Sequence, residues 1–185
     1  YLDVNRPLPE NDLAGEVAGI VLWINGPVAN SRALGNWLRK QMAAGIKTAI
    51  FGQFPSGLAI PMTVLGLESG QAIGAGSVPT IRIQDPMFGF ETPIRAVRND
   101  EPPLRLRAGS SDASRPLLRL EDARGARHDA AAITPWGGYA LNPYVIAQIP
   151  GTEQTRWVID PFAFLRAALA LPDIPVPDTT TENGR

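Results

Sequence analysis

The chain of 185 residues contains no cysteine and a single histidine, His128. Without cysteine it can form no disulfide bond, thiolate metal site or cysteine nucleophile. A Ser-His-Asp arrangement would have to use His128, which stands in the charged stretch ARGARHD. We expect that stretch to be an exposed hairpin, so the residues alone name no reaction, and we expect no metal or other cofactor.

The sequence also has no excess of charge of either sign. Its 17 Lys and Arg residues against 18 Asp and Glu residues give a net charge of −1, with no basic run. We therefore expect no nucleic acid among its partners. No apolar run reaches the roughly 18 residues that a membrane span needs, so we expect no membrane insertion. The absence of cysteine is compatible with either the cytoplasm or the periplasm.

Proline and polar residues concentrate at the two ends of the chain, in NRPLPEND and in LPDIPVPDTTTENGR. Such composition is typical of linkers. We predict an N-terminal linker at residues 1–13, a single α/β domain at residues 14–171 and a Pro-rich linker at residues 172–185. This organisation indicates a piece of a longer protein.

A β-strand, a helix and a second β-strand are predicted in the first third of the domain. Residues 16–24, EVAGIVLWI, carry apolar side chains on both faces, which favours a central strand covered on both sides. Residues 31–44 have apolar residues at helical spacing behind Asn30 or Ser31 as N-cap. Residues 46–54 then predict a parallel strand, so the three segments form a βαβ unit.

Later elements are predicted to be shorter. Residues 60–70 favour a weak helix, and from about residue 80 onward β-like runs alternate with Pro, Gly, Asn and Asp. A last helix is predicted over residues 161–170, with Asp160 as N-cap and Pro161 in its first turn. We expect an α/β fold with an open, mostly parallel sheet and extra β-hairpins in the C-terminal half.

The loop after the first strand is one candidate binding site. Its candidate residues are Asn25, Gly26, Asn30 and Ser31. Backbone N–H groups at a helix N-terminus can bind a phosphate, but Pro27 removes one donor and no Lys or Arg precedes Arg32. An ordinary capped turn is the alternative, and we expect no tight flavin or nucleotide binding here.

Aromatic residues gather in a second candidate, TPWGGYALNPY at residues 134–144. Trp136 and Tyr139 flank two glycines, a composition typical of a loop that stacks on a flat or sugar-like ligand. A tight turn filled by rings from a neighbouring strand is the alternative.

The segments GEVAGIVLWINGP and RWVIDPFAFLRAALALPDIPVPDTTTENGR resemble the central region of the Pel exopolysaccharide-processing family. These are multidomain periplasmic proteins of Gram-negative biofilm formers. In that family an α/β domain similar to flavodoxin-like reductases or amidotransferases lies between a glycoside-hydrolase-like domain and a metal-dependent polysaccharide deacetylase domain. The resemblance implies a flavodoxin-like three-layer sandwich in a periplasmic protein. No catalytic residue of the family carries over to these residues.

Two functions follow as hypotheses. The resemblance implies a non-catalytic module that positions adjacent hydrolase and deacetylase domains in biofilm polysaccharide biosynthesis and contacts polysaccharide or an export-complex protein. The alternative is a flavin- or nucleotide-binding flavodoxin-like enzyme that uses the loop at Asn25 to Ser31.

Overall fold

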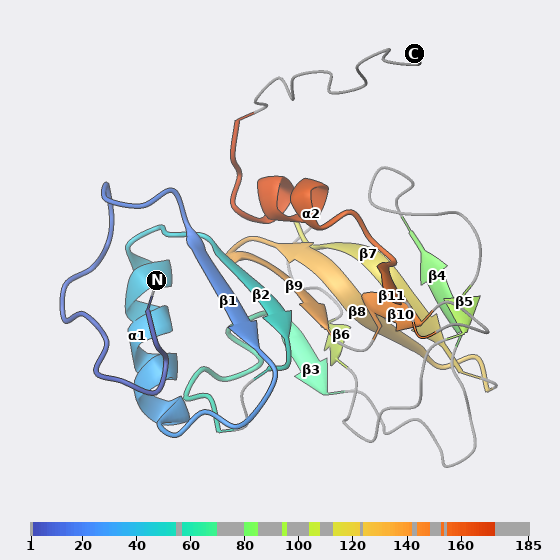
Figure 1. Cartoon of the computed structure of the whole chain (residues 1–185), viewed down its shortest axis with the longest axis horizontal. Helices are drawn as coiled ribbons and strands as arrows, with labels where there is room; N and C mark the ends of the chain where they lie inside the picture. Colours follow the sequence, from blue (N-terminus) through green and yellow to red (C-terminus); the bar gives the residue numbers. More distant parts are fainter. Residues whose placement is uncertain are drawn as a thin grey trace.

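The structure is a computed structural model of the whole chain (Figure 1). It describes residues 2–54, 57–69, 80–84, 94–95, 104–107, 113–122, 124–141, 144–148, 153 and 155–172. Of the C-terminal linker predicted at residues 172–185, residues 173–185 lie outside the described residues.

Strands outnumber helices in the described part of the chain. The strands are β1 (Ile20–Ile24), β2 (Thr48–Gly52), β3 (Leu67–Ser69), β4 (Thr80–Ile83), β5 (Ile94–Arg95), β6 (Leu104–Leu106), β7 (Arg115–Glu121), β8 (Arg127–Thr134), β9 (Gly137–Leu141), β10 (Ile146–Gln148) and β11 (Thr155–Trp157). The two helices are α1 (Ser31–Ala43) and α2 (Pro161–Ala168).

A seven-stranded mixed sheet forms the body of the molecule, in the order β1-β2-β9-β8-β7-β4-β5. Only β1, β2 and β9 run parallel, whereas every pairing from β9 onward through β8, β7, β4 and β5 is antiparallel. Two small antiparallel sheets, β3-β6 and β10-β11, are added. The prediction of a flavodoxin-like, mostly parallel three-layer sandwich is therefore wrong.

The first strand lies at the edge of this sheet and not at its centre, which corrects the prediction for residues 16–24. Leu22 and Ile24 are buried, but Val21 and Trp23, which point to the opposite face, are 52% and 48% exposed. The βαβ unit itself is confirmed, because β1 and β2 are parallel and α1 connects them. An edge strand with one covered face can still carry apolar residues on both faces, so composition alone did not reveal its position.

The predicted aromatic loop contains the strand β9, which lies between β2 and β8 near the middle of the sheet. Gly137 and Gly138 explain why the sequence pattern did not predict a strand here, because glycine is uncommon inside strands. A Cβ atom on Gly138 would lie 2.7 Å from the Ala132 carbonyl oxygen and 3.2 Å from the Phe164 ring, so only glycine fits between β8 and α2.

The weak helix predicted at residues 60–70 is also absent. Residues 62–66 form turns, and β3 follows with Leu67 paired to Leu106. Gly66 has φ +69°, a left-handed conformation that ends the turn before a full helix can form.

Both helices have the predicted caps. Asn30 Oδ1 accepts a hydrogen bond from the Ala33 nitrogen at 3.1 Å, and Asp160 Oδ1 accepts hydrogen bonds from the nitrogens of Phe162 and Ala163 at 2.8 and 3.1 Å. Figure 1 shows α2 above the middle of the sheet and α1 beside β1. Under α2, the Phe51 and Phe164 rings meet edge to face with centroids 5.0 Å apart.

Candidate functional site

The parallel strands β1, β2 and β9 end in register, since Ile24 pairs with Gly52 and Gly52 pairs with Leu141. In open α/β sheets the loops after such strand ends are the usual binding edge. Asn25 and Gly26 lie there, the first exposed and the second half-buried. Gly52 is required at this edge, because with φ +88° its Cβ atom would lie 1.9 Å from the Ile24 carbonyl oxygen.

The polar side chains at the start of α1 are already bound to the chain itself. Asn30 caps the helix, and the Ser31 hydroxyl donates to the Val28 carbonyl oxygen at 3.1 Å. These are the interactions of an ordinary helix start.

Two backbone donors near the start of α1 are occupied too. The Ala29 nitrogen donates to Asn5 Oδ1 at 2.9 Å, and the Leu34 nitrogen donates to the Asn30 carbonyl oxygen at 3.0 Å. Pro27 has no N–H group. The flavin-binding alternative rested on a flavodoxin-like fold, which the sheet order contradicts.

The second pair of candidate residues, Trp136 and Tyr139, lies away from that edge. Trp136 precedes β9 at its amino end, and its Nε1 donates to the Leu65 carbonyl oxygen at 2.9 Å. Tyr139 is fully buried, its hydroxyl donates to the Asp129 carbonyl oxygen at 3.1 Å, and its ring packs against Phe54. Burial and the nearby Asp129 charge raise the pKa of Tyr139 well above 10.0. Its ring cannot stack on a ligand while it occupies this position.

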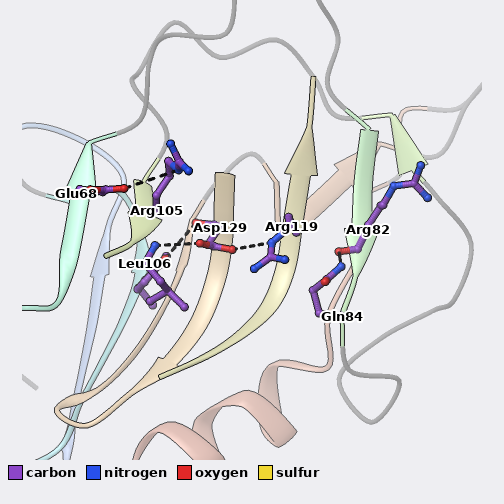
Figure 2. A network of polar contacts seen from close by, with 8 residues as sticks. Glu68, Arg82, Gln84, Arg105, Leu106, Arg119 and Asp129 are labelled. Atoms are coloured by element: carbon purple, nitrogen blue, oxygen red, sulfur yellow. Dashed lines mark hydrogen bonds and ion pairs between the residues drawn. The ribbon is translucent and has the colours of Figure 1, made fainter. Parts of the chain in front are cut away.

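A network of polar contacts that the sequence analysis did not predict crosses the antiparallel half of the sheet (Figure 2). At its centre Asp129, only 6% exposed, accepts hydrogen bonds from Arg119 Nε at 3.0 Å and from the Leu106 nitrogen at 2.9 Å. One carboxylate thus joins β8 to both β7 and β6. The small β3-β6 sheet is thereby fastened to the large sheet.

The pairing of β7 with β8 places Asp129 directly opposite Arg119. Register shifts occur between Pro116 and Leu118 and between Leu118 and Arg119, but they cancel, so Arg119 and Asp129 pair in the same register as Arg115 and Ile133. Opposite charges directly across two antiparallel strands stabilise the pairing. Alternating arginines in PLRLR and PLLRLED were the available sequence signal, but they do not reveal which distant residue lies opposite each of them.

Two more exposed ion pairs flank this centre. Arg105 Nε lies 3.9 Å from Glu68 Oε1, and Arg82 Nε lies 2.7 Å from Glu121 Oε2. Asp122 accepts hydrogen bonds from the nitrogens of Arg124 and Ala126, each at 2.8 Å, and shapes the β7-β8 turn.

His128 lies in the predicted hairpin but is buried, with 2% of its surface exposed, so the expectation of an exposed histidine is wrong. Among the residues that the structure describes, its Nδ1 has no hydrogen-bond partner. Burial, and secondarily the charge of Arg105, lowers the pKa of His128 below 6.5. A neutral imidazole paired across the strands with Leu120 contributes to the apolar interior.

Aromatic side chains pack together beside the edge strand β1, on the face of the sheet that α2 covers. The Trp23 ring is stacked on Phe51 with centroids 5.4 Å apart and meets the Trp157 ring edge-on at 6.0 Å. Val21 and Trp23 are the large apolar side chains of β1 that are exposed. No function of this surface was predicted from the sequence.

No protein-family model, curated protein or solved structure matches this chain. Neither described helix is long and apolar enough to cross a bilayer. Within the described ranges, no three side chains of the metal-ligating types are grouped so that they could hold a metal ion.

Proposed function

We propose that this chain is a non-catalytic module of a periplasmic, Pel-type exopolysaccharide-processing protein, in which it positions a hydrolase-like and a deacetylase domain. The segments around Ile20–Ile24 and Pro161–Ala168 carry the resemblance that supports the proposal. The structural observation that carries it is the attachment of residues 2–13 to α1.

Gln41 is the main attachment point of this N-terminal segment. It is fully buried, and its side-chain amide accepts from the Leu13 nitrogen at 2.9 Å and donates to the Asn11 carbonyl oxygen at 3.2 Å. One turn away, Trp37 Nε1 donates to the Pro9 carbonyl oxygen at 3.0 Å. Asn5 extends the attachment to the loop before α1 through Ala29.

A segment that is hydrogen-bonded to a helix in this way restricts the orientation of a flanking domain relative to that helix, whereas a free linker does not. A flexible linker lets flanking domains sample many relative positions. Residues 2–13 make side-chain hydrogen bonds at several points along α1, so a domain attached at this end would have a restricted orientation. Polysaccharide or an export-complex protein would then contact a surface of fixed geometry.

The first test is the coding sequence on either side of the chain together with an activity assay. We expect a hydrolase-like domain before Tyr1, a deacetylase domain after Arg185, and acetate release from acetylated amino-sugar polymer by the parent protein alone. Acetate release by the isolated chain would contradict the non-catalytic role. Different flanking domains would contradict the Pel assignment.

A second test separates positioning from folding in the parent protein. Gln41→Ala should slow deacetylation of the polymer while leaving hydrolysis of a small acetyl ester unchanged, because only the polymer must meet several domains at once. The matched control is Asn36→Ala, an exposed residue of the same helix. Equal rates of polymer deacetylation by the unmodified parent protein, Gln41→Ala and Asn36→Ala would refute a positioning role of the N-terminal segment.

A further inference from the structure

The two end strands of the large sheet differ in how they are protected. At one end β5 is two residues long and contains Arg95. At the other end β1 is five residues long, IVLWI, and no charged residue occurs from Val17 to Ser31. Natural sheets usually protect an edge with charge, proline, a bulge or short length. β1 has none of these, and its pairing with β2 is continuous.

The backbone of β1 determines which groups face outward. The Ile20 nitrogen donates to the Lys47 carbonyl oxygen at 2.9 Å, and the Ile24 carbonyl oxygen accepts from the Gln53 nitrogen at 2.8 Å, so these residues face β2. Because backbone groups alternate along a strand, the N–H and C=O of Val21 face the outer edge. The Val21 side chain is half-exposed on the α2 side.

We propose that a second copy of this chain pairs with β1, antiparallel, about a twofold axis at Val21. The two Val21 residues would exchange N–H···O=C hydrogen bonds, and Gly19 would lie opposite the partner's Trp23. The Leu169 side chain already lies 2.8 Å from where a Cβ atom of Gly19 would be, so the partner's indole ring would contact Leu169 there. The inference does not depend on the proposed function.

Charge and self-complementarity favour a second copy over a different partner. A twofold axis at Val21 brings only uncharged residues together, because the nearest charged residue on the N-terminal side is Glu16, which would lie opposite the partner's Gly26. A net charge of −1 adds little repulsion between copies. A five-residue strand buries less than the roughly 1,600 Å² of a standard interface, so the dimer should be weak and depend on concentration.

Sedimentation velocity over a wide concentration range tests the proposal. The unmodified chain should pass from monomer to dimer, and Val21→Lys should weaken dimerisation about tenfold or more by opposing two charges at the axis. Val64→Lys is the matched control, since Val64 is 66% exposed on the β2-β3 connection. A chain that stays monomeric throughout, or a Val21→Lys variant that dimerises normally, would overturn the proposal.

Cysteine cross-linking gives a second readout that does not require Val21→Lys to fold. Paired residues of this kind have Cα atoms about 5.5 Å apart, within disulfide range, and the chain has no cysteine of its own. Under mild oxidation with oxidised glutathione, Val21→Cys should form a covalent dimer much faster than Val64→Cys. Equal rates would overturn the pairing. The pairing would also be overturned if the Val21 amide exchanged slowly in the protein with its flanking domains but not in the isolated chain. That result would assign the edge to a domain of the same protein.

Discussion

Asp129 uses both carboxylate oxygens within the fold, one for Arg119 Nε at 3.0 Å and the other for the Leu106 nitrogen at 2.9 Å. Asp129→Asn removes the charge and should lower the free energy of unfolding by about 1–3 kcal/mol, because Arg119 and the backbone donor lose a charged acceptor in a mostly buried place. Urea denaturation measures the change. The side chains of Asp129 and Arg119 are 8% and 27% exposed.

The matched control for Asp129 is Glu121→Gln at the more exposed pair with Arg82. Solvent screening should limit its effect to less than about 1 kcal/mol. Equal losses in the two variants would contradict the central role assigned to Asp129.

His128 makes stability depend on pH. Its pKa is lowered in the folded chain by burial and then by Arg105, against 6.5 when unperturbed. As the pH falls below 6.5 the unfolded chain binds this proton first, so the free energy of unfolding decreases until the pH lies below the folded pKa. Denaturant titrations across this range should show the loss.

A His128→Gln variant provides the comparison for that pH dependence. It cannot titrate, so the part of the slope that comes from this residue should disappear, whatever the variant's absolute stability. An unchanged slope would show that other groups cause the acid sensitivity.

At the scale of elements, β1 has one buried and one half-exposed face. Leu22→Ala should cost about 2–4 kcal/mol of unfolding free energy, because Leu22 is only 5% exposed within the core. Val21→Ala should cost less than about 1 kcal/mol in dilute, monomeric protein. Denaturation of both variants measures the difference, and similar losses would indicate a strand covered on both sides.

The capping of α2 gives a second prediction at this scale. Asp160→Ala removes the acceptor for the nitrogens of Phe162 and Ala163 and should cost about 0.5–2 kcal/mol. Asp160→Asn keeps an acceptor oxygen and should lose only the smaller charge-dipole part, about 0.3–1 kcal/mol. Thermal melting compares them, and an Asn variant as unstable as the Ala variant would argue against capping by hydrogen bonds.

At the scale of the whole molecule, the N-terminal segment is hydrogen-bonded to α1. The linker at residues 1–13 stays a prediction from proline and polar composition. In the isolated chain, Gln41→Ala should expose the Leu13 amide and speed its hydrogen exchange, because that amide loses its acceptor. Exchange unchanged relative to Asn36→Ala would contradict the attachment.

Contacts within a few residues could be predicted from the sequence. The helix α1 with its Asn30 cap, the strand β2 and the helix α2 behind Asp160 all followed from apolar spacing and capping residues. The β-like runs after residue 80 likewise indicated much of the antiparallel half. These signals are local, because a cap or an amphipathic stripe acts within one or two turns of its own element.

Only the tertiary structure decided how the strands are ordered and which side chains are buried. β9 inserts between β2 and β8 through pairings such as Thr48 with Gly137, between residues far apart in the chain. That insertion buries Tyr139, leaves β1 at the edge and replaces the expected parallel sandwich by a mixed sheet. The sequence by itself determined the local elements, because their interactions lie along the chain. The order of the strands depends on which distant apolar surfaces pack together. Because the hydrophobic effect is non-directional, a local sequence pattern does not specify these partners.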